Sequence, residues 1–75
     1  MLEMPKTENR IEISDNREII LDGVESIKEF EVNYVTLRLK KYSVKVVGDE
    51  ITVLEFEEGR ALLSGRLFSV NFLYE

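Results

Sequence analysis

The sequence contains no cysteine, no histidine and no tryptophan, and only one proline. Without cysteine it forms no disulfide, and without histidine a zinc site lacks its commonest ligand and a Ser-His-Asp triad is impossible. The chain has 75 residues, which is one domain, and domains this small usually need a disulfide, a metal or a partner subunit for support. We therefore expect self-association, as a homodimer, or binding to another protein.

Long hydrophobic runs are also missing. No stretch approaches the roughly 18 apolar residues of a transmembrane helix, and residues 1–6 lack the apolar segment of a signal peptide. The lack of cysteine fits a reducing compartment, so we expect a cytoplasmic protein. Residues 1–9 are polar and include Pro5, which predicts a flexible tail before a single domain over residues 10–75.

Charge is unevenly distributed along the chain. The formal net charge of -5 disfavours nucleic-acid binding, which needs a basic surface. Residues 36–47, however, carry four basic residues and no acidic one: Arg38, Lys40, Lys41 and Lys45. On strands joined near Tyr42 these four would form a positive patch. It is either a solvated face whose lysines discourage aggregation, or a docking site for an acidic partner or an anionic lipid surface.

The pattern of apolar residues predicts an all-β fold. β-branched and aromatic residues dominate the regular segments, and Val35, Leu37 and Leu39 alternate with polar residues. Turn residues recur every eight to twelve positions, which predicts a small antiparallel sheet or sandwich of six or seven short strands. The segment Glu25–Glu31 could instead form a short helix by its composition.

Several local features are expected within this sheet. Reversals or bends are predicted at Asp15-Asn16, Asp22-Gly23, Asn33-Tyr34, Lys41-Tyr42, Gly48-Asp49, Glu58-Gly59 and Gly65. A bulge is predicted within Ile51–Phe56, because its apolar residues change phase. In the last segment, Phe68, Val70, Phe72 and Tyr74 should line one face.

A partial internal repeat links two parts of the chain. With a shift of 26 residues, Glu29-Phe30-Glu31 coincides with Glu55-Phe56-Glu57, and Val35 and Leu37 coincide with Ala61 and Leu63. Alternating segments also match by chance, so duplication and coincidence both remain open. A true repeat predicts two similar β layers, each burying the apolar face of the other.

The sequence contains no clear catalytic motif. Glu55, Glu57 and Glu58 are close together, but no histidine or cysteine accompanies them, and a solvated strand face explains them better. Neither a calcium-binding loop nor a glycine-rich phosphate loop surrounds the acidic residues or the glycines. We therefore expect a protein that is not an enzyme and that has no cofactor and no metal.

A set of glycines and apolar positions carries a resemblance to a known family. They are Arg17-Glu18, Asp22-Gly23-Val24, Ile27 with Phe30, Val35-Thr36-Leu37, Val47-Gly48 with Ile51, Glu58-Gly59, Leu63-Ser64-Gly65 and Phe68 to Tyr74. With these residues the chain resembles the YabP family of sporulation proteins (YabP/YqfC-like). The resemblance implies a protein made in the mother cell of an endospore-forming bacterium and linked to a membrane protein, and it carries over no catalytic motif.

Two functional hypotheses follow. The first is a non-enzymatic interaction module that assembles with itself and with a membrane-protein partner during spore morphogenesis, in which Arg38, Lys40, Lys41 and Lys45 bind the partner. The alternative is a regulatory β domain that binds a small anion.

Overall fold

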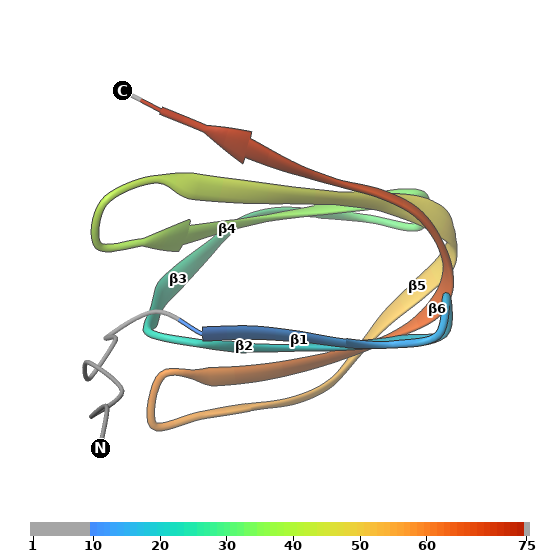
Figure 1. Ribbon diagram of the computed structural model, residues 1–75, viewed down its shortest axis with the longest axis horizontal. Helices are drawn as coiled ribbons and strands as arrows, with labels where there is room; N and C mark the ends of the chain where they lie inside the picture. The colour runs from blue at the N-terminus through green and yellow to red at the C-terminus, as the bar shows by residue number, and fades with distance from the viewer. Residues whose placement is uncertain (1–9, 75) are drawn as a thin grey trace, which may run out of the picture.

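The computed structural model describes residues 10–74, and these form six strands in one sheet (Figure 1). The strands are β1 (Arg10–Ser14), β2 (Glu18–Asp22), β3 (Val24–Glu31), β4 (Tyr34–Leu39), β5 (Ser43–Glu57) and β6 (Arg60–Leu73). They are hydrogen-bonded in the order β1-β2-β6-β5-β4-β3, and every neighbouring pair is antiparallel. The predicted all-β class is confirmed, and Glu25–Glu31 is strand, not helix. The predicted tail over residues 1–9 lies outside the described residues.

The strands β5 and β6 are much longer than expected, with 15 and 14 residues. The prediction of a hairpin turn at Gly48-Asp49 is wrong, because these residues lie inside β5. A Cβ atom at Gly48 would lie 2.1 Å from the carbonyl oxygen of Arg66, so glycine lets β6 approach β5 closely here. Gly65 also lies inside its strand, with a φ of 143°, opposite the register shift between Asp49 and Thr52, so the bend expected there takes the form of an irregularity within the β5–β6 pairing.

These two glycines mark the place where the sheet folds over itself. Figure 1 shows β4, the first part of β5 and the end of β6 above, and β1, β2 and the β5–β6 hairpin below. Between them lies the core, whose fully buried members include Ile19 and Leu63 from the lower part and Leu37 and Val46 from the upper part. Each such side chain contributes about 1.5–3 kcal/mol when fully buried, so this shared core is the main stabilising term.

The internal repeat corresponds to two hairpins with matching register. In the β3–β4 hairpin Phe30 is opposite Val35 and Ile27 opposite Leu37, and in the β5–β6 hairpin Phe56 is opposite Ala61 and Val53 opposite Leu63. Each hairpin has a register shift directly before its phenylalanine, between Ile27 and Glu29 and between Val53 and Glu55. The bulge predicted within Ile51–Phe56 is therefore confirmed. The two copies of the repeat share both their cross-strand pairing and the position of the register shift.

The end of β6 departs from the expected alternation at one residue. A register shift between Val47 and Gly48 leaves Phe68 without a direct partner on β5. Leu67 is consequently buried and Phe68 is exposed, with its ring 5.8 Å from the Arg66 guanidinium carbon. Of the predicted common face of Phe68, Val70, Phe72 and Tyr74, the residues Val70 and Phe72 share the face of the core, whereas Phe68 does not. Tyr74 lies beyond the end of β6.

Candidate functional site

The β4–β5 hairpin carries all four candidate residues, and we call Arg38, Lys40, Lys41 and Lys45 the basic hairpin. Lys40 and Lys41 lie in its connection, which the hydrogen bond from Leu39 N–H to Tyr42 C=O closes at 2.9 Å. Cross-strand pairing sets Arg38 opposite Ser43 and Lys45 opposite Thr36, so Arg38 and Lys45 are diagonal neighbours on one face. Such neighbours lie about 7–8 Å apart, close enough for their fields to add.

This face is the outer one, because Leu37 and Val44 point into the core between the basic residues. The Lys45 ammonium lies 4.4 Å from the centre of the Tyr34 ring, a cation–π geometry that holds its charge at the surface. On the other side, Arg38 Nε is 3.6 Å from Glu25 Oε1, and Thr36 Oγ1 is 3.2 Å from Glu29 Oε1. The basic hairpin is thus bordered by the carboxylates of β3.

An aromatic cluster lies beside the basic hairpin. The Tyr42 ring packs edge-on against Phe72 at 5.4 Å and against Tyr74 at 5.7 Å between ring centres. Phe72 retains 48% of its surface exposed and Tyr74 76%. Tyr42 therefore links the connection of the basic hairpin to the end of β6.

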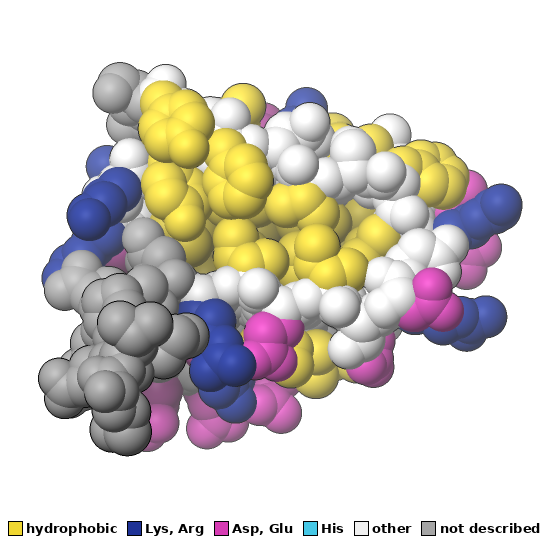
Figure 2. Space-filling model, viewed as in Figure 1, with side chains coloured by type: hydrophobic (Ala, Val, Ile, Leu, Met, Phe, Trp, Pro, Cys, Tyr) yellow, Lys and Arg dark blue, Asp and Glu magenta, His cyan; other side chains and the backbone are white. Residues whose placement is uncertain are grey.

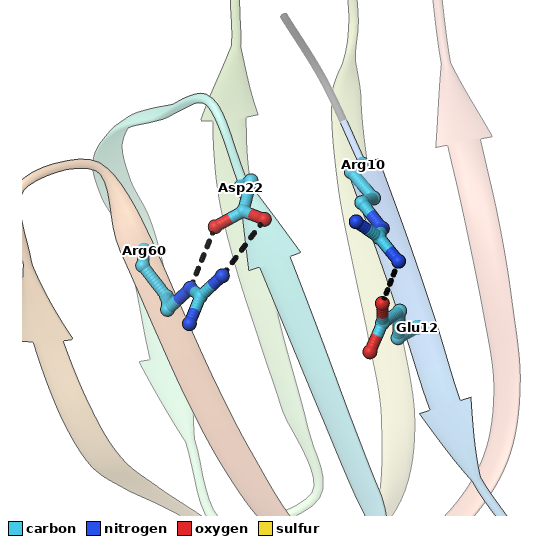
Figure 3. A network of polar contacts seen from close by, with 4 residues as sticks. All are labelled: Arg10, Glu12, Asp22 and Arg60. Carbon is cyan, nitrogen blue, oxygen red and sulfur yellow. Dashed lines mark hydrogen bonds and ion pairs between the residues drawn. The ribbon is translucent and has the colours of Figure 1, made fainter. Parts of the chain in front are cut away.

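A row of charged residues crosses the lower part of the fold (Figure 3). Arg60 donates two hydrogen bonds to the Asp22 carboxylate, at 2.8 and 3.4 Å, and Arg10 forms an ion pair with Glu12. The hydrogen bond from Arg60 lowers the pKa of the Asp22 carboxyl. Arg10, Asp22, Arg60 and Glu57 are successive cross-strand partners, so their charges alternate across four strands. The sequence alone did not predict this row, because the order of the strands in the sheet brings the four residues together.

The carboxylates considered for catalysis lie at the exposed end of the β5–β6 hairpin. Glu55 is opposite Leu62 and Glu57 opposite Arg60, and both are exposed. Within the described residues, no group of three or more potential ligands could hold a metal ion. The same part of the chain contains no helix that could cross a membrane.

A shallow hollow near the β1–β2 turn is the place to test the small-anion hypothesis. Its lining includes Arg17 and Arg66, but also the carboxylates of Asp15, Glu18 and Glu50. Two backbone donors there, the N–H groups of residues 65 and 67, already donate to the carbonyls of residues 17 and 16. The acidic groups outnumber the basic ones, so this hollow does not favour an anion.

Comparison with models of protein families shows which family the chain belongs to. The model of the YabP family matches residues 5–75, which is nearly the whole chain. The chain belongs to the YabP family. No curated protein and no solved structure matches it. The resemblance expected from the sequence is therefore confirmed, over a longer range than residues 17–74, and YabP membership indicates a role related to sporulation.

Proposed function

We propose that this YabP protein is a non-enzymatic assembly module of spore morphogenesis, which docks its basic hairpin onto an acidic surface of a membrane-protein partner. One observation carries the proposal: four of the chain's ten basic residues belong to one hairpin, where Arg38 and Lys45 share its outer face. The family link to sporulation supplies the setting.

The charge distribution supports docking through this hairpin. The chain as a whole is acidic, with a net charge of -5, so a locally positive surface gives an approaching partner a defined orientation. Exposed charges of this kind contribute more to association rate and orientation than to affinity. The carboxylates of Glu25 and Glu29 lie beside Arg38 and Thr36 on this face, so the positive field is concentrated at the connection and on the side of Lys45.

The side-chain inventory supports a role without catalysis. The sequence offers no histidine or cysteine as base or nucleophile, and the clustered carboxylates of β5 are exposed on a strand face. A protein that acts by contact needs only a stable fold and a specific surface. We place this contact on the cytoplasmic side of a mother-cell membrane, in agreement with the membrane protein implied by the family resemblance.

The test compares two variants of equal charge. In the first, Arg38, Lys40, Lys41 and Lys45 are all replaced by Gln, and in the control Arg10, Arg17, Lys28 and Arg66 are replaced by Gln. Both proteins lose four positive charges, but only the first loses the basic hairpin. Each is mixed with membranes from sporulating cells and sedimented, with circular dichroism as the check on folding.

We expect the wild type and the control to sediment with the membranes. The amount of the hairpin variant left in the supernatant should be several-fold larger than that of either protein. Added salt should release the wild type in parallel, because exposed charges are screened beyond about 8 Å at physiological ionic strength. Equal sedimentation of all three proteins would contradict docking through the basic hairpin.

A further inference from the structure

The second half of β6 has a strand on only one side. The strand β2 pairs Glu18–Asp22 with Arg60–Ser64 and ends there, while β5 accompanies β6 as far as Leu73. On the side left by β2, Leu67 N–H donates to Asn16 C=O at 2.7 Å. Beyond Leu67, no strand of the described residues covers this side. We call residues 69–74 the open edge.

Strand alternation determines which backbone groups the open edge presents. The Leu67 N–H points to the uncovered side, and the extra residue Phe68 at the register shift reverses the alternation after it. The N–H and C=O groups of Val70 and Phe72 therefore point to the uncovered side, and those of Ser69, Asn71 and Leu73 point to β5. Such a row of backbone donors and acceptors is a template for pairing with another strand.

The edge strands β1 and β3 have features that discourage pairing with another strand, whereas the open edge lacks them. Proteins protect edge strands with charged side chains, proline or bulges. The edge strand β1 carries Arg10 and Glu12, and the edge strand β3 carries four charged residues and two register shifts. Residues 67–74 contain no charged residue and no proline, although 33% of the chain is charged. Strand-forming residues without charge are the composition that favours strand association.

Exposed apolar side chains accompany the open edge. Val70 and Phe72 are partners of Val46 and Val44, so they share the face of the core, yet Phe72 is half exposed and Tyr74 mostly exposed. On the opposite side of the core Ile13 of the edge strand β1 is 54% exposed. Figure 2, drawn from the same side as Figure 1, shows hydrophobic side chains gathered between the upper and lower strands. A strand added at the open edge would cover part of this surface.

We propose that the open edge pairs antiparallel with the open edge of a second copy of this chain, around a twofold axis at Asn71. In this register Asn71 is opposite Asn71 of the second copy, and Ser69 is opposite its Leu73. Its hydrogen bonds join the outward-facing backbone groups of Val70 to those of Phe72 of the second copy, and the Leu67–Asn16 hydrogen bond stays intact. Val70 is then opposite Phe72 of the second copy on the apolar face, so one contact satisfies the backbone and buries the exposed side chains.

Charge favours a second copy as the occupant. A twofold contact needs a surface that is complementary to itself, and an uncharged edge meets this condition in a chain whose net charge of -5 otherwise repels its copies. At the centre of the proposed contact, the basic residue Lys45 is opposite Asn71 on β5. The two Lys45 residues would lie three strand spacings apart, about 14 Å, which exceeds the screening length of about 8 Å.

The pairing does not depend on the proposed docking function. Lys45 and Arg38 lie on the outer face of the sheet, whereas Val70 and Phe72 lie on the core face. The Gln variant of the basic hairpin should therefore remain a dimer even if it loses membrane binding. A dimer that fails to form would refute the pairing and leave the docking proposal to its own test.

The test measures molar mass in solution for the wild type and two lysine variants. The wild type should sediment as a dimer of the 8.8 kDa chain at micromolar concentrations. Asn71→Lys places a charge at the centre of the open edge and should give a monomer. Its side chain is exposed and bonds only Lys45 C=O and Ser69 Oγ, so the fold should tolerate the change. Ser14→Lys, on the edge strand β1, adds the same charge and should remain a dimer.

Both lysine variants reduce the net negative charge, so a monomer cannot result from stronger general repulsion. The chain has no cysteine, so a single introduced cysteine gives a second readout. Asn71→Cys should be joined to its copy by a short bifunctional thiol crosslinker, because opposed residues in a non-hydrogen-bonded pair have Cα atoms about 4.5 Å apart. Ser14→Cys is the control. A monomeric wild type, a dimeric Asn71→Lys protein, or equal crosslinking at both positions would overturn the proposal.

Discussion

The bend of the sheet can be tested by adding a single methyl group at Gly48. In Gly48→Ala the new Cβ would lie 2.1 Å from the Arg66 carbonyl oxygen, 3.0 Å from its carbon and 3.1 Å from Leu67 Cα. All three atoms belong to the backbone of β6, so no side chain can rotate away. The two strands must separate by about an ångström where both turn from one part of the fold into the other.

The magnitude follows from the behaviour of overpacked interiors. Extra methyl groups cost about 1–3 kcal/mol and occasionally more, and a clash between two backbones lies at the upper end of this range. A domain of 75 residues has a total stability of about 4–11 kcal/mol, so Gly48→Ala should remove about a quarter of it or more. Urea unfolding followed by circular dichroism should show a midpoint lower by about 1–3 M.

Gly59→Ala is the matched control. The nearest atom to its new Cβ would be the Val24 carbonyl oxygen at 3.6 Å, an ordinary contact, but Gly59 has a φ of 77°. The positive φ costs an alanine about 1–2 kcal/mol. Gly48→Ala should therefore be the more destabilised of the two. A Gly48→Ala protein as stable as the wild type, or more stable than Gly59→Ala, would refute close strand approach as the cause of the bend.

Two further predictions concern the core and the polar row. Leu37→Ala should lose about 2–5 kcal/mol in urea unfolding because Leu37 is fully buried, whereas Leu54→Ala at a 55% exposed site should change little; equal effects would contradict the assigned core. Arg60 lowers the pKa of Asp22 below its ordinary value of 3.8, so the pair stabilises the fold above about pH 4 and the gain is lost as the pH falls through the lowered value. The stability difference between wild type and Asp22→Asn should therefore shrink on acidification, and a difference that persists at pH 2 would speak against the ion pair.

Much of the strand pattern follows from local sequence. The strand Arg10–Ser14 and the reversals at Asp15-Asn16 and Glu58-Gly59 lie where alternation and turn residues predict them. The continuity of β5 through Gly48 could not be predicted in this way. A glycine between two alternating segments indicates either a turn or a close approach, and only the position of Arg66 on the neighbouring strand decides between them.

The same distinction applies to the candidate site. Alternation alone predicts that Arg38 and Lys45 point outward on adjoining strands, and the structure places them so. The neighbouring carboxylate of Glu25 could not be assigned, because two register shifts in β3 change which of its side chains face Arg38. The pair of Asp22 and Arg60 is 38 residues apart and depends on β2 lying beside β6, which is a property of the whole sheet.

The central claim is that this YabP protein acts in sporulation through the surface of its basic hairpin. The most direct measurement is the number of heat-resistant spores formed by an endospore-forming bacterium whose own copy is replaced by the Gln variant of Arg38, Lys40, Lys41 and Lys45. At equal protein level, the account predicts a marked loss of spores with this variant and normal numbers with the control lacking Arg10, Arg17, Lys28 and Arg66. Wild-type spore numbers with the hairpin variant would contradict it.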